Sequence, residues 1–161
     1  MKTKELALTS LFIALLIAQN YILFNFPLTL TYAILYFLAK KLESKNLPFL
    51  AVLAFVIIKN IITPALPTTI IADLIGLSLF ILICKIPSKW LNYVTIPFVI
   101  VFHVLLMDFS TAILVANPLK VFLANIGYGF IAYIYAPLSI IIIVLIDGIE
   151  VLTNYEINET R

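Results

Sequence analysis

The chain has 161 residues, of which 64% are apolar and 11% are charged. Soluble globular domains average about 45–50% apolar and about 25% charged residues, so this composition excludes an ordinary water-soluble fold. Because a membrane-spanning helix needs about 20 apolar residues, the chain has room for six or seven spans and for no attached soluble domain. The net charge is +2, the single Cys84 excludes an internal disulfide, and no GxxxxGK[ST] phosphate loop occurs. We expect one compact membrane domain without its own ATP site.

The apolar runs predict six membrane-spanning helices in chain order. The first run follows Lys2 and Lys4, as in a signal peptide, but no small-x-small cleavage site follows it, which favours a spanning helix. The second run, after Pro27, is short, and its outer end is expected to be irregular or tilted. Only the Pro64–Pro67 turn separates the third and fourth runs, which predicts an antiparallel helix pair. The predicted spans are residues 6–24, 26–39, 48–63, 67–84, 93–116 and 126–146.

The basic residues predict the orientation of these spans. Six spans place both termini on one side, and eight of the ten basic residues fall on that side, whereas Lys120 lies on the other and Lys59 within a span. The positive-inside rule assigns the basic side to the cytoplasm. We therefore expect an all-α integral membrane protein in the cell membrane, a six-transmembrane-helix bundle formed by residues 1–161 with cytoplasmic N- and C-termini. The eight residues are Lys2, Lys4, Lys40, Lys41, Lys45, Lys85, Lys89 and Arg161.

Small side chains form a stripe along the first predicted helix. At 100° per residue, Ala7, Ser10, Ala14 and Ala18 fall within a sector about 80° wide. Such stripes let two helix backbones approach closely in lipid. The simpler interpretation, which the sequence favours, is packing against another helix of the same chain. The alternative is a docking surface for a different membrane subunit.

The first helix also carries a family resemblance. Its Ala14-Leu15-Leu16-Ile17-Ala18 segment has an AxxxA pattern, and it opens a short six-span chain with a basic N-terminus and no ATP site. The chain thereby resembles the substrate-binding S component of energy-coupling factor (ECF) vitamin transporters. The resemblance implies that Ala14 and Ala18 contact a transmembrane coupling subunit, that two ATPase subunits supply the energy, and that the loaded S component tilts in the membrane.

Four ionisable residues, Lys59, Asp73, His103 and Asp108, lie within predicted spans, where charged groups are costly and are functional hypotheses by default. Lys59 and Asp73 lie about 6 and 9 Å inside the outer ends of neighbouring helices, so they are close enough to meet. They form either an ion pair that holds the helical hairpin together or the polar floor of a substrate pocket. We interpret His103 as a hydrogen-bonded packing residue, because the chain shows no metal-ligand spacing.

Other hydrogen-bonding side chains gather in the outer halves of the third to sixth spans. A small planar solute, vitamin-like or nucleobase-like, would stack on Tyr128 and be oriented by amide and carboxylate groups. Hydrogen bonding between helices without any ligand would give a similar pattern. The predicted substrate-binding residues are Lys59, Asn60, Thr69, Asp73, Asp108, Thr111, Asn125 and Tyr128.

Three further segments receive predicted roles. The segments Asn25–Thr31 and Asn117–Asn125, both expected outside, are the candidate lids. Asp147 and Glu150 lie one turn apart near the end of the last span, and we expect them to be solvated or to meet basic residues of a partner.

The sequence favours a substrate-capturing subunit that takes up a small solute from outside and works with ATP-hydrolysing partners. The alternative is a non-catalytic membrane scaffold subunit of a cell-shape or cell-wall complex. An enzyme ranks lower, because the chain has a single His and scattered carboxylates. Proton-coupled transport through Asp73 and Asp108 also ranks lower, because the chain has no internal repeat. We expect no catalytic residue, no cofactor, no metal and no nucleic-acid partner.

Overall fold

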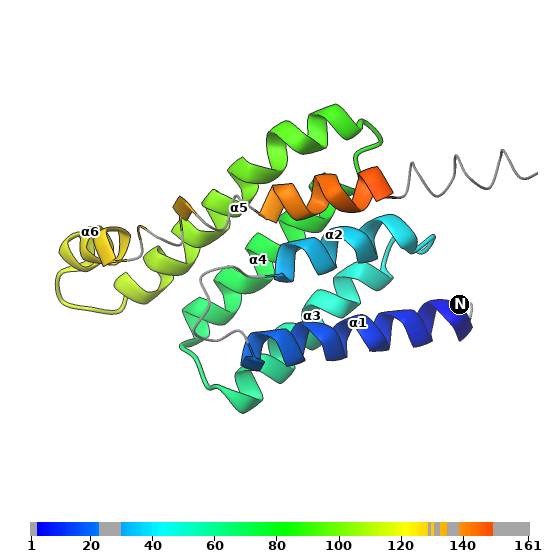
Figure 1. Cartoon of the computed structure of the whole chain (residues 1–161). Coiled ribbons are helices and arrows are strands. Elements are labelled where there is room, and N and C mark those ends of the chain that lie inside the picture. Colours follow the sequence, from blue (N-terminus) through cyan, green and yellow to red (C-terminus); the bar gives the residue numbers. More distant parts are fainter. Residues whose placement is uncertain (1–2, 23–29, 129, 131–132, 135–138, 150–161) are drawn as a thin grey trace, which may run out of the picture.

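The computed structural model describes residues 3–22, 30–128, 130, 133–134 and 139–149, and the secondary structure of these residues is α-helical (Figure 1). Three helices, α1, α4 and α5, are long and apolar enough to cross a membrane, whereas α3 and the helix Ser139–Ile149 are apolar but shorter. The helices are α1 (Thr3–Ile22), α2 (Thr31–Lys41), α3 (Leu47–Ile62), α4 (Pro67–Cys84), α5 (Lys89–Ala112), α6 (Pro118–Tyr128) and Ser139–Ile149. An all-α fold with three helices suited to a membrane is therefore established for this part of the chain.

The helix bounds follow the predicted spans closely in the middle of the chain. α4 matches residues 67–84 at both ends, and α3 lies within one residue of 48–63. α5 begins four residues before the predicted 93, because the Ser88 side chain accepts a hydrogen bond from the Leu91 N–H at 3.3 Å and caps the helix. α2 begins only at Thr31 and has 11 residues, so it is shorter than the predicted 26–39.

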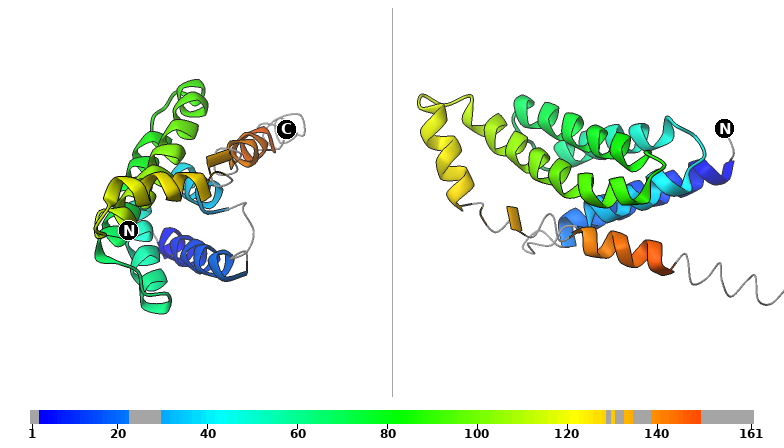
Figure 2. Two further views of the ribbon diagram at one scale, coloured as in Figure 1. Left: turned by 90° about the vertical axis from the view of Figure 1, so that its left-hand side faces the viewer. Right: turned by 90° about the horizontal axis from the view of Figure 1, so that it is seen from above.

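Among the described residues, the region of the sixth predicted span contains the end of α6 and the helix Ser139–Ile149. α6 begins at Pro118, a favourable first position because the first turn of a helix needs no N–H donor there. The helix Ser139–Ile149 runs in a different direction from α6 (Figure 2). The predicted lid at Asn117–Asn125 therefore belongs mostly to α6, while residues 25–29 of the other predicted lid lie outside the described residues.

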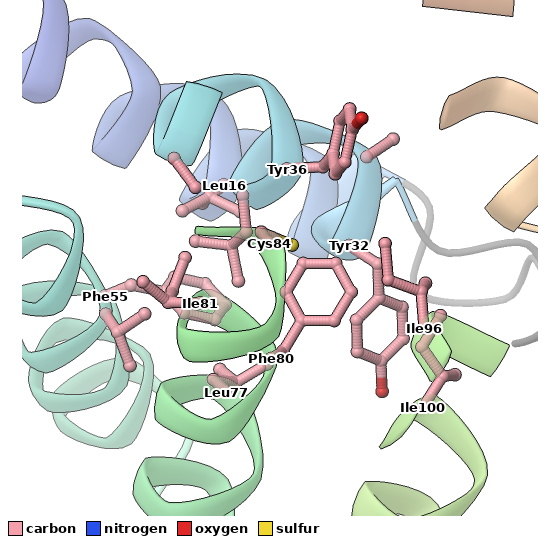
Figure 3. Packing of buried hydrophobic residues seen from close by; sticks show 14 of the residues in the cluster. Leu16, Tyr32, Tyr36, Phe55, Leu77, Phe80, Ile81, Cys84, Ile96 and Ile100 are labelled. Atoms are coloured by element: carbon pink, nitrogen blue, oxygen red, sulfur yellow. The ribbon is translucent and has the colours of Figure 1, made fainter. Parts of the chain in front are cut away.

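α2 lies at the centre of the packing although it is short. Six of its 11 residues are buried, and it contacts α1, α3 and α4. Figure 3 shows its tyrosines Tyr32 and Tyr36 in this core, where the Tyr32 ring lies beside Phe80 of α4 with ring centroids 5.3 Å apart. The buried core around it consists of Leu16, Tyr32, Ala33, Leu35, Tyr36, Ala39, Val52, Phe55, Val56, Leu77, Phe80, Ile81, Cys84, Ile96, Ile100 and Ile143.

Two side chains of α1 fasten it to the segments around α2. The Glu5 carboxylate accepts the backbone N–H groups of Glu43 and Ser44 at 3.0 and 3.1 Å. At the other end, the Gln19 amide donates to the Thr31 hydroxyl at 2.6 Å and accepts the Leu30 N–H at 3.3 Å. α1 is thus tied at both ends to the connections of the central helix.

The two ends of the bundle differ in charge. α1, α3 and α5 begin at one end, and α2 and α4 end there (Figure 1). We call this the lysine-rich end, and we call the end that holds the start of α4, the end of α5 and α6 the opposite end. The lysine-rich end carries Lys4, Lys40, Lys41, Lys45, Lys85 and Lys89.

Candidate functional site

A hydrogen-bonded chain of four side chains joins α2, α3, α4 and α5. The Asp73 carboxylate of α4 accepts from Lys59 Nζ of α3 at 2.7 Å through Oδ2. Its other oxygen, Oδ1, lies 3.2 Å from His103 Nε2 of α5, and His103 Nδ1 lies 2.9 Å from the Tyr32 hydroxyl of α2. We call these four residues the Asp73 cluster. Asp73, His103 and Tyr32 are buried, whereas the Lys59 side chain is 25% exposed.

The arrangement of protons in the cluster follows from its chemistry. A carboxylate oxygen can only accept, so His103 Nε2 carries a hydrogen and donates it to Asp73. In the neutral imidazole, Nδ1 is then left to accept from the Tyr32 hydroxyl. Asp73 therefore lies between an ammonium and an imidazole donor, which compensates much of the cost of burying its charge.

Gly76 allows His103 to approach Asp73. It lies one helical turn beyond Asp73 on α4, where an added Cβ would stand 2.5 Å from Cγ of the His103 ring. Carbon atoms do not approach this closely, so any larger residue at this position would displace the imidazole. Gly76 thus leaves the space in which the His103 ring of α5 packs against α4 beside Asp73.

The Asp73 cluster lines a cavity of about 230 Å³. Its lining combines polar side chains with the apolar residues Phe55, Leu77 and Met107. A few polar groups beside an apolar wall are typical of small-molecule sites, and the volume is below the roughly 300–1,000 Å³ of drug-sized pockets. The cavity therefore suits a small solute. Its lining is Asn20, Thr31, Tyr32, Phe55, Lys59, Asp73, Leu77, His103 and Met107.

The structure brings Lys59 and Asp73 together, as their predicted depths suggested. Both alternatives considered for the pair hold geometrically, since the two residues form an ion pair and also line the cavity. Two other predicted site residues do not line it. Asn60 donates to the Val56 carbonyl of its own helix at 2.8 Å, and Thr69 accepts from Ser110 Oγ of α5 at 3.4 Å.

Three of the remaining predicted residues, Asp108, Thr111 and Asn125, form a separate network that joins α5 to α6. Asn125 Nδ2 donates to Thr111 Oγ1 at 2.9 Å and to the Asp108 carbonyl at 3.3 Å. The Asp108 carboxylate accepts from the Tyr133 hydroxyl. Tyr128 is the last residue of α6, and its side chain lies outside the described residues. Of the predicted set, Lys59 and Asp73 thus belong to the Asp73 cluster, and Asp108, Thr111 and Asn125 belong to this second network.

Sequence reasoning did not assign His103 and Tyr32 to the site. The sequence predicts a hydrogen-bonded His103 but does not identify its partners, which lie on α4 and α2. The spacing of Asp73 and Gly76 was the available signal, because a small residue one turn from a buried carboxylate leaves room for a side chain of another helix.

The expectation that Asp147 is solvated is wrong. It is 5% exposed, and its Oδ2 accepts from the hydroxyls of Tyr36 and Tyr93, each at 2.6 Å. The reason is tertiary, because the helix Ser139–Ile149 brings its last turn against α2 and α5 rather than into solvent. We call Asp147, Tyr36 and Tyr93 the Asp147 cluster. Glu150 lies outside the described residues.

The small-residue stripe of α1 faces outward. Ala7, Ser10, Ala14 and Ala18 are all exposed, whereas the buried residues Thr9 and Leu16 lie on the opposite face of the helix. The favoured expectation, that the stripe packs against another helix of this chain, is therefore wrong for the residues that the structure describes.

Comparison of the chain with protein families, curated proteins and solved structures gives no match. Among the described residues, no group of three or more His, Cys, Asp and Glu is placed to hold a metal ion. The Asp73 cluster offers hydrogen-bond donors and acceptors from an ammonium, a carboxylate, an imidazole and a phenol within one small cavity.

Proposed function

We propose that the protein is the substrate-capturing subunit of a membrane transporter, similar to an ECF S component, with six spans in the cell membrane and cytoplasmic termini. The observation that carries this proposal is the cavity of about 230 Å³ around Asp73, Lys59 and His103. Buried ionisable groups inside a membrane protein are costly and are typical of substrate pathways. The cavity lies toward the opposite end of the bundle, away from the basic residues. The positive-inside rule places the basic end in the cytoplasm and therefore the cavity end outside.

The lining suggests how a solute would bind. Without a solute, Lys59 and Asp73 pair with one another, and Lys59 is the more exposed of the two. A carbonyl or carboxylate of the solute would accept from Lys59, while a ring N–H would donate to Asp73. The flat face of the solute would lie against Phe55 and Leu77. A vitamin-like or nucleobase-like molecule offers these groups in a small volume.

The outward stripe on α1 supports a role for a partner subunit. Exposed Ala14 and Ala18 leave room for a foreign helix to approach the α1 backbone, which is how small residues promote helix association in lipid. In the proposed complex this helix belongs to a transmembrane coupling subunit, and two ATPase subunits supply the energy. The chain itself then needs neither a cofactor nor a catalytic residue.

A ligand screen tests the cavity. The purified protein is heated in detergent with a panel of vitamins and nucleobases, and a ligand that binds the folded state raises the melting temperature. We expect Asp73→Asn to lower the affinity for that ligand by about tenfold, which is the effect of losing a hydrogen bond to a charged group. Asp147→Asn, a matched change of a buried carboxylate outside the cavity, should leave affinity unchanged. Silence across the panel, or equal losses in both variants, would contradict the proposal.

A purification experiment tests the partner. Wild-type protein extracted in mild detergent is expected to bring down a larger membrane subunit and ATPases. Ala14→Leu with Ala18→Leu should abolish this while sparing ligand binding, whereas Ala124→Leu, the same type of substitution at one exposed position of α6, should retain the partners. Recovery with cell-wall or cytoskeletal factors alone would favour the scaffold alternative.

A further inference from the structure

A second polar cavity, of about 500 Å³, lies at the lysine-rich end of the bundle. It is bounded by the end of α2, the α2–α3 connection and the α4–α5 connection, none of which contributes to the Asp73 cluster. Three lysines and one glutamate line it, so its charged side chains amount to three ammonium groups against one carboxylate. The lining residues are Ala39, Lys40, Glu43, Lys45, Cys84, Lys85, Ile86 and Pro87.

The contacts of two lysines hold them at this cavity. Lys85 Nζ donates to the Ser44 carbonyl at 3.3 Å, and Lys40 Nζ lies 5.5 Å from the centre of the Tyr36 ring. Both side chains belong to half-buried residues, and neither of these contacts supplies a negative charge. The lysines are thus positioned around one space rather than spread over the surface.

The charges at this cavity are crowded. Burial lowers the pKa of Lys85, and the neighbouring Lys45 charge lowers it further. Both effects disfavour the charged form of Lys85. An anion bound in the cavity would offset the repulsion between Lys45 and Lys85, because its negative charge would lie near both ammonium groups.

The surroundings place this cavity at the edge of the apolar surface. Trp90, which begins the first turn of α5 with Lys89, is 76% exposed, and Leu82 and Leu91 are 55% and 42% exposed. Tryptophan with one polar edge is typical of the interface between the acyl chains and the headgroups of a bilayer. The exposed leucines extend this surface along α4 and α5, the two longest apolar helices beside the cavity.

We propose that this cavity binds the phosphate headgroup of an anionic phospholipid, with Lys40, Lys45 and Lys85 around the phosphate. Exposed Leu82 and Trp90 would contact its acyl chains. Basic pockets between membrane helices bind lipid headgroups in this way. The adjoining apolar surface favours a lipid over a free phosphate ion, because only a lipid can contact the lysines with its headgroup and the apolar surface with its acyl chains. This proposal is independent of the solute that the Asp73 cluster binds.

Native mass spectrometry of the full-length protein tests the site. The protein is equilibrated in detergent with a mixture of phosphatidylcholine and phosphatidylglycerol, and the lipid retained on the folded protein is quantified. We expect selective retention of phosphatidylglycerol, with a loss of about fivefold in affinity for each lysine replaced in Lys40→Gln, Lys45→Gln and Lys85→Gln. The matched control, Lys4→Gln with Lys41→Gln and Lys89→Gln, removes three charges from the same end outside the cavity, and it should keep the selectivity.

Three outcomes would overturn the proposal. Equal losses in the two triple variants would mean that the charge of this whole end attracts lipid without a site. Stabilisation or displacement by inorganic phosphate, at the strength of the lipid, would mean that a free anion is the ligand. If the cavity variants do not fold, Glu43→Gln decides instead, because removal of the one lining carboxylate should tighten phosphatidylglycerol binding and an unchanged affinity would contradict the site.

Discussion

Asp73 and Asp147 are both at most 5% exposed, yet they are satisfied in different ways. The central helix α2 contributes one tyrosine to each of the two clusters. Tyr32 and Tyr36 lie one turn apart, and their hydroxyls point in opposite directions (Figure 3). Tyr36 donates directly to Asp147, whereas Tyr32 reaches Asp73 through His103. Asp73 is paired with a lysine and lines a cavity, while the described residues give Asp147 two hydroxyl donors and no cation.

This difference separates a site that can exchange partners from a structural contact. The Lys59 end of the Asp73 cluster is partly exposed, so a solute can compete for the ammonium and the carboxylate. The Asp147 carboxylate is held by side chains of two other helices, and its role is to join the helix Ser139–Ile149 to α2 and α5. The proposed binding site therefore rests on the cation and the cavity beside Asp73, and not on the burial of the carboxylate alone.

The largest effect should come from removing the charge of Asp73. Asp73→Asn leaves Lys59 without its counter-charge, and breaking a buried ion pair costs about 3–5 kcal/mol. Because Lys59 is a quarter exposed, we expect the lower end, about 3 kcal/mol, in the free energy of unfolding measured by chemical denaturation in mixed micelles. If Asp73→Asn lowered the free energy of unfolding by less than Asp147→Asn does, the proposed difference between the two carboxylates would be wrong.

A change on the neighbouring face of α4 should weaken the same cluster without touching its charges. Gly76→Ala forces the His103 ring away from Asp73, and such overpacking costs about 1–3 kcal/mol. The control is Gly127→Ala on α6, where an added Cβ meets no atom within 4 Å, so stability should stay the same or rise. In a double-mutant cycle with His103→Ala, the cost of Gly76→Ala should largely disappear; an undiminished cost would show that the ring is not the obstacle.

At the Asp147 cluster, the loss of one hydroxyl should have an intermediate effect. Tyr36→Phe keeps the buried ring and removes one donor to a carboxylate, which costs about 1.5 kcal/mol. Tyr21→Phe, the same change on an exposed tyrosine of α1, should stay within about 0.5 kcal/mol of wild type. Equal effects of the two changes would mean that the bond to Asp147 contributes nothing.

The smallest effect is expected for the matched change at the second carboxylate. Asp147→Asn retains an amide oxygen that can accept from both Tyr36 and Tyr93, and it strands no described cation, so we expect less than about 1 kcal/mol. The measurement is the same denaturation used for Asp73→Asn. A loss as large as that of Asp73→Asn would indicate that Asp147 has a cationic partner after all.

The sequence predicted helix bounds well where turn residues mark them and poorly elsewhere. The prolines at 64 and 67 marked the α3–α4 turn, and this turn makes α3 and α4 neighbours, so that Lys59 and Asp73 lie at depths where they can meet. In contrast, hydropathy alone joins residues 126–146 into one span, although the sequence carries Gly127, Gly129 and Pro137 there, which were the available signals for separating α6 from the helix Ser139–Ile149. Hydropathy measures only how apolar a stretch is, and it does not report where the chain changes direction.

What the sequence determined by itself was local: an apolar, helical chain, lysines gathered at the helix ends of one side, a stripe of small residues on one face of α1, and the depth of each ionisable residue along its helix. Only the tertiary structure decided which faces meet. It turned the stripe of Ala14 and Ala18 outward, decided that the hydrogen-bond partners of His103 are Asp73 and Tyr32, and buried Asp147 against two tyrosines. The physical reason is that periodicity gives the direction of a side chain around its own helix, whereas its partner depends on how the neighbouring helices are rotated and spaced.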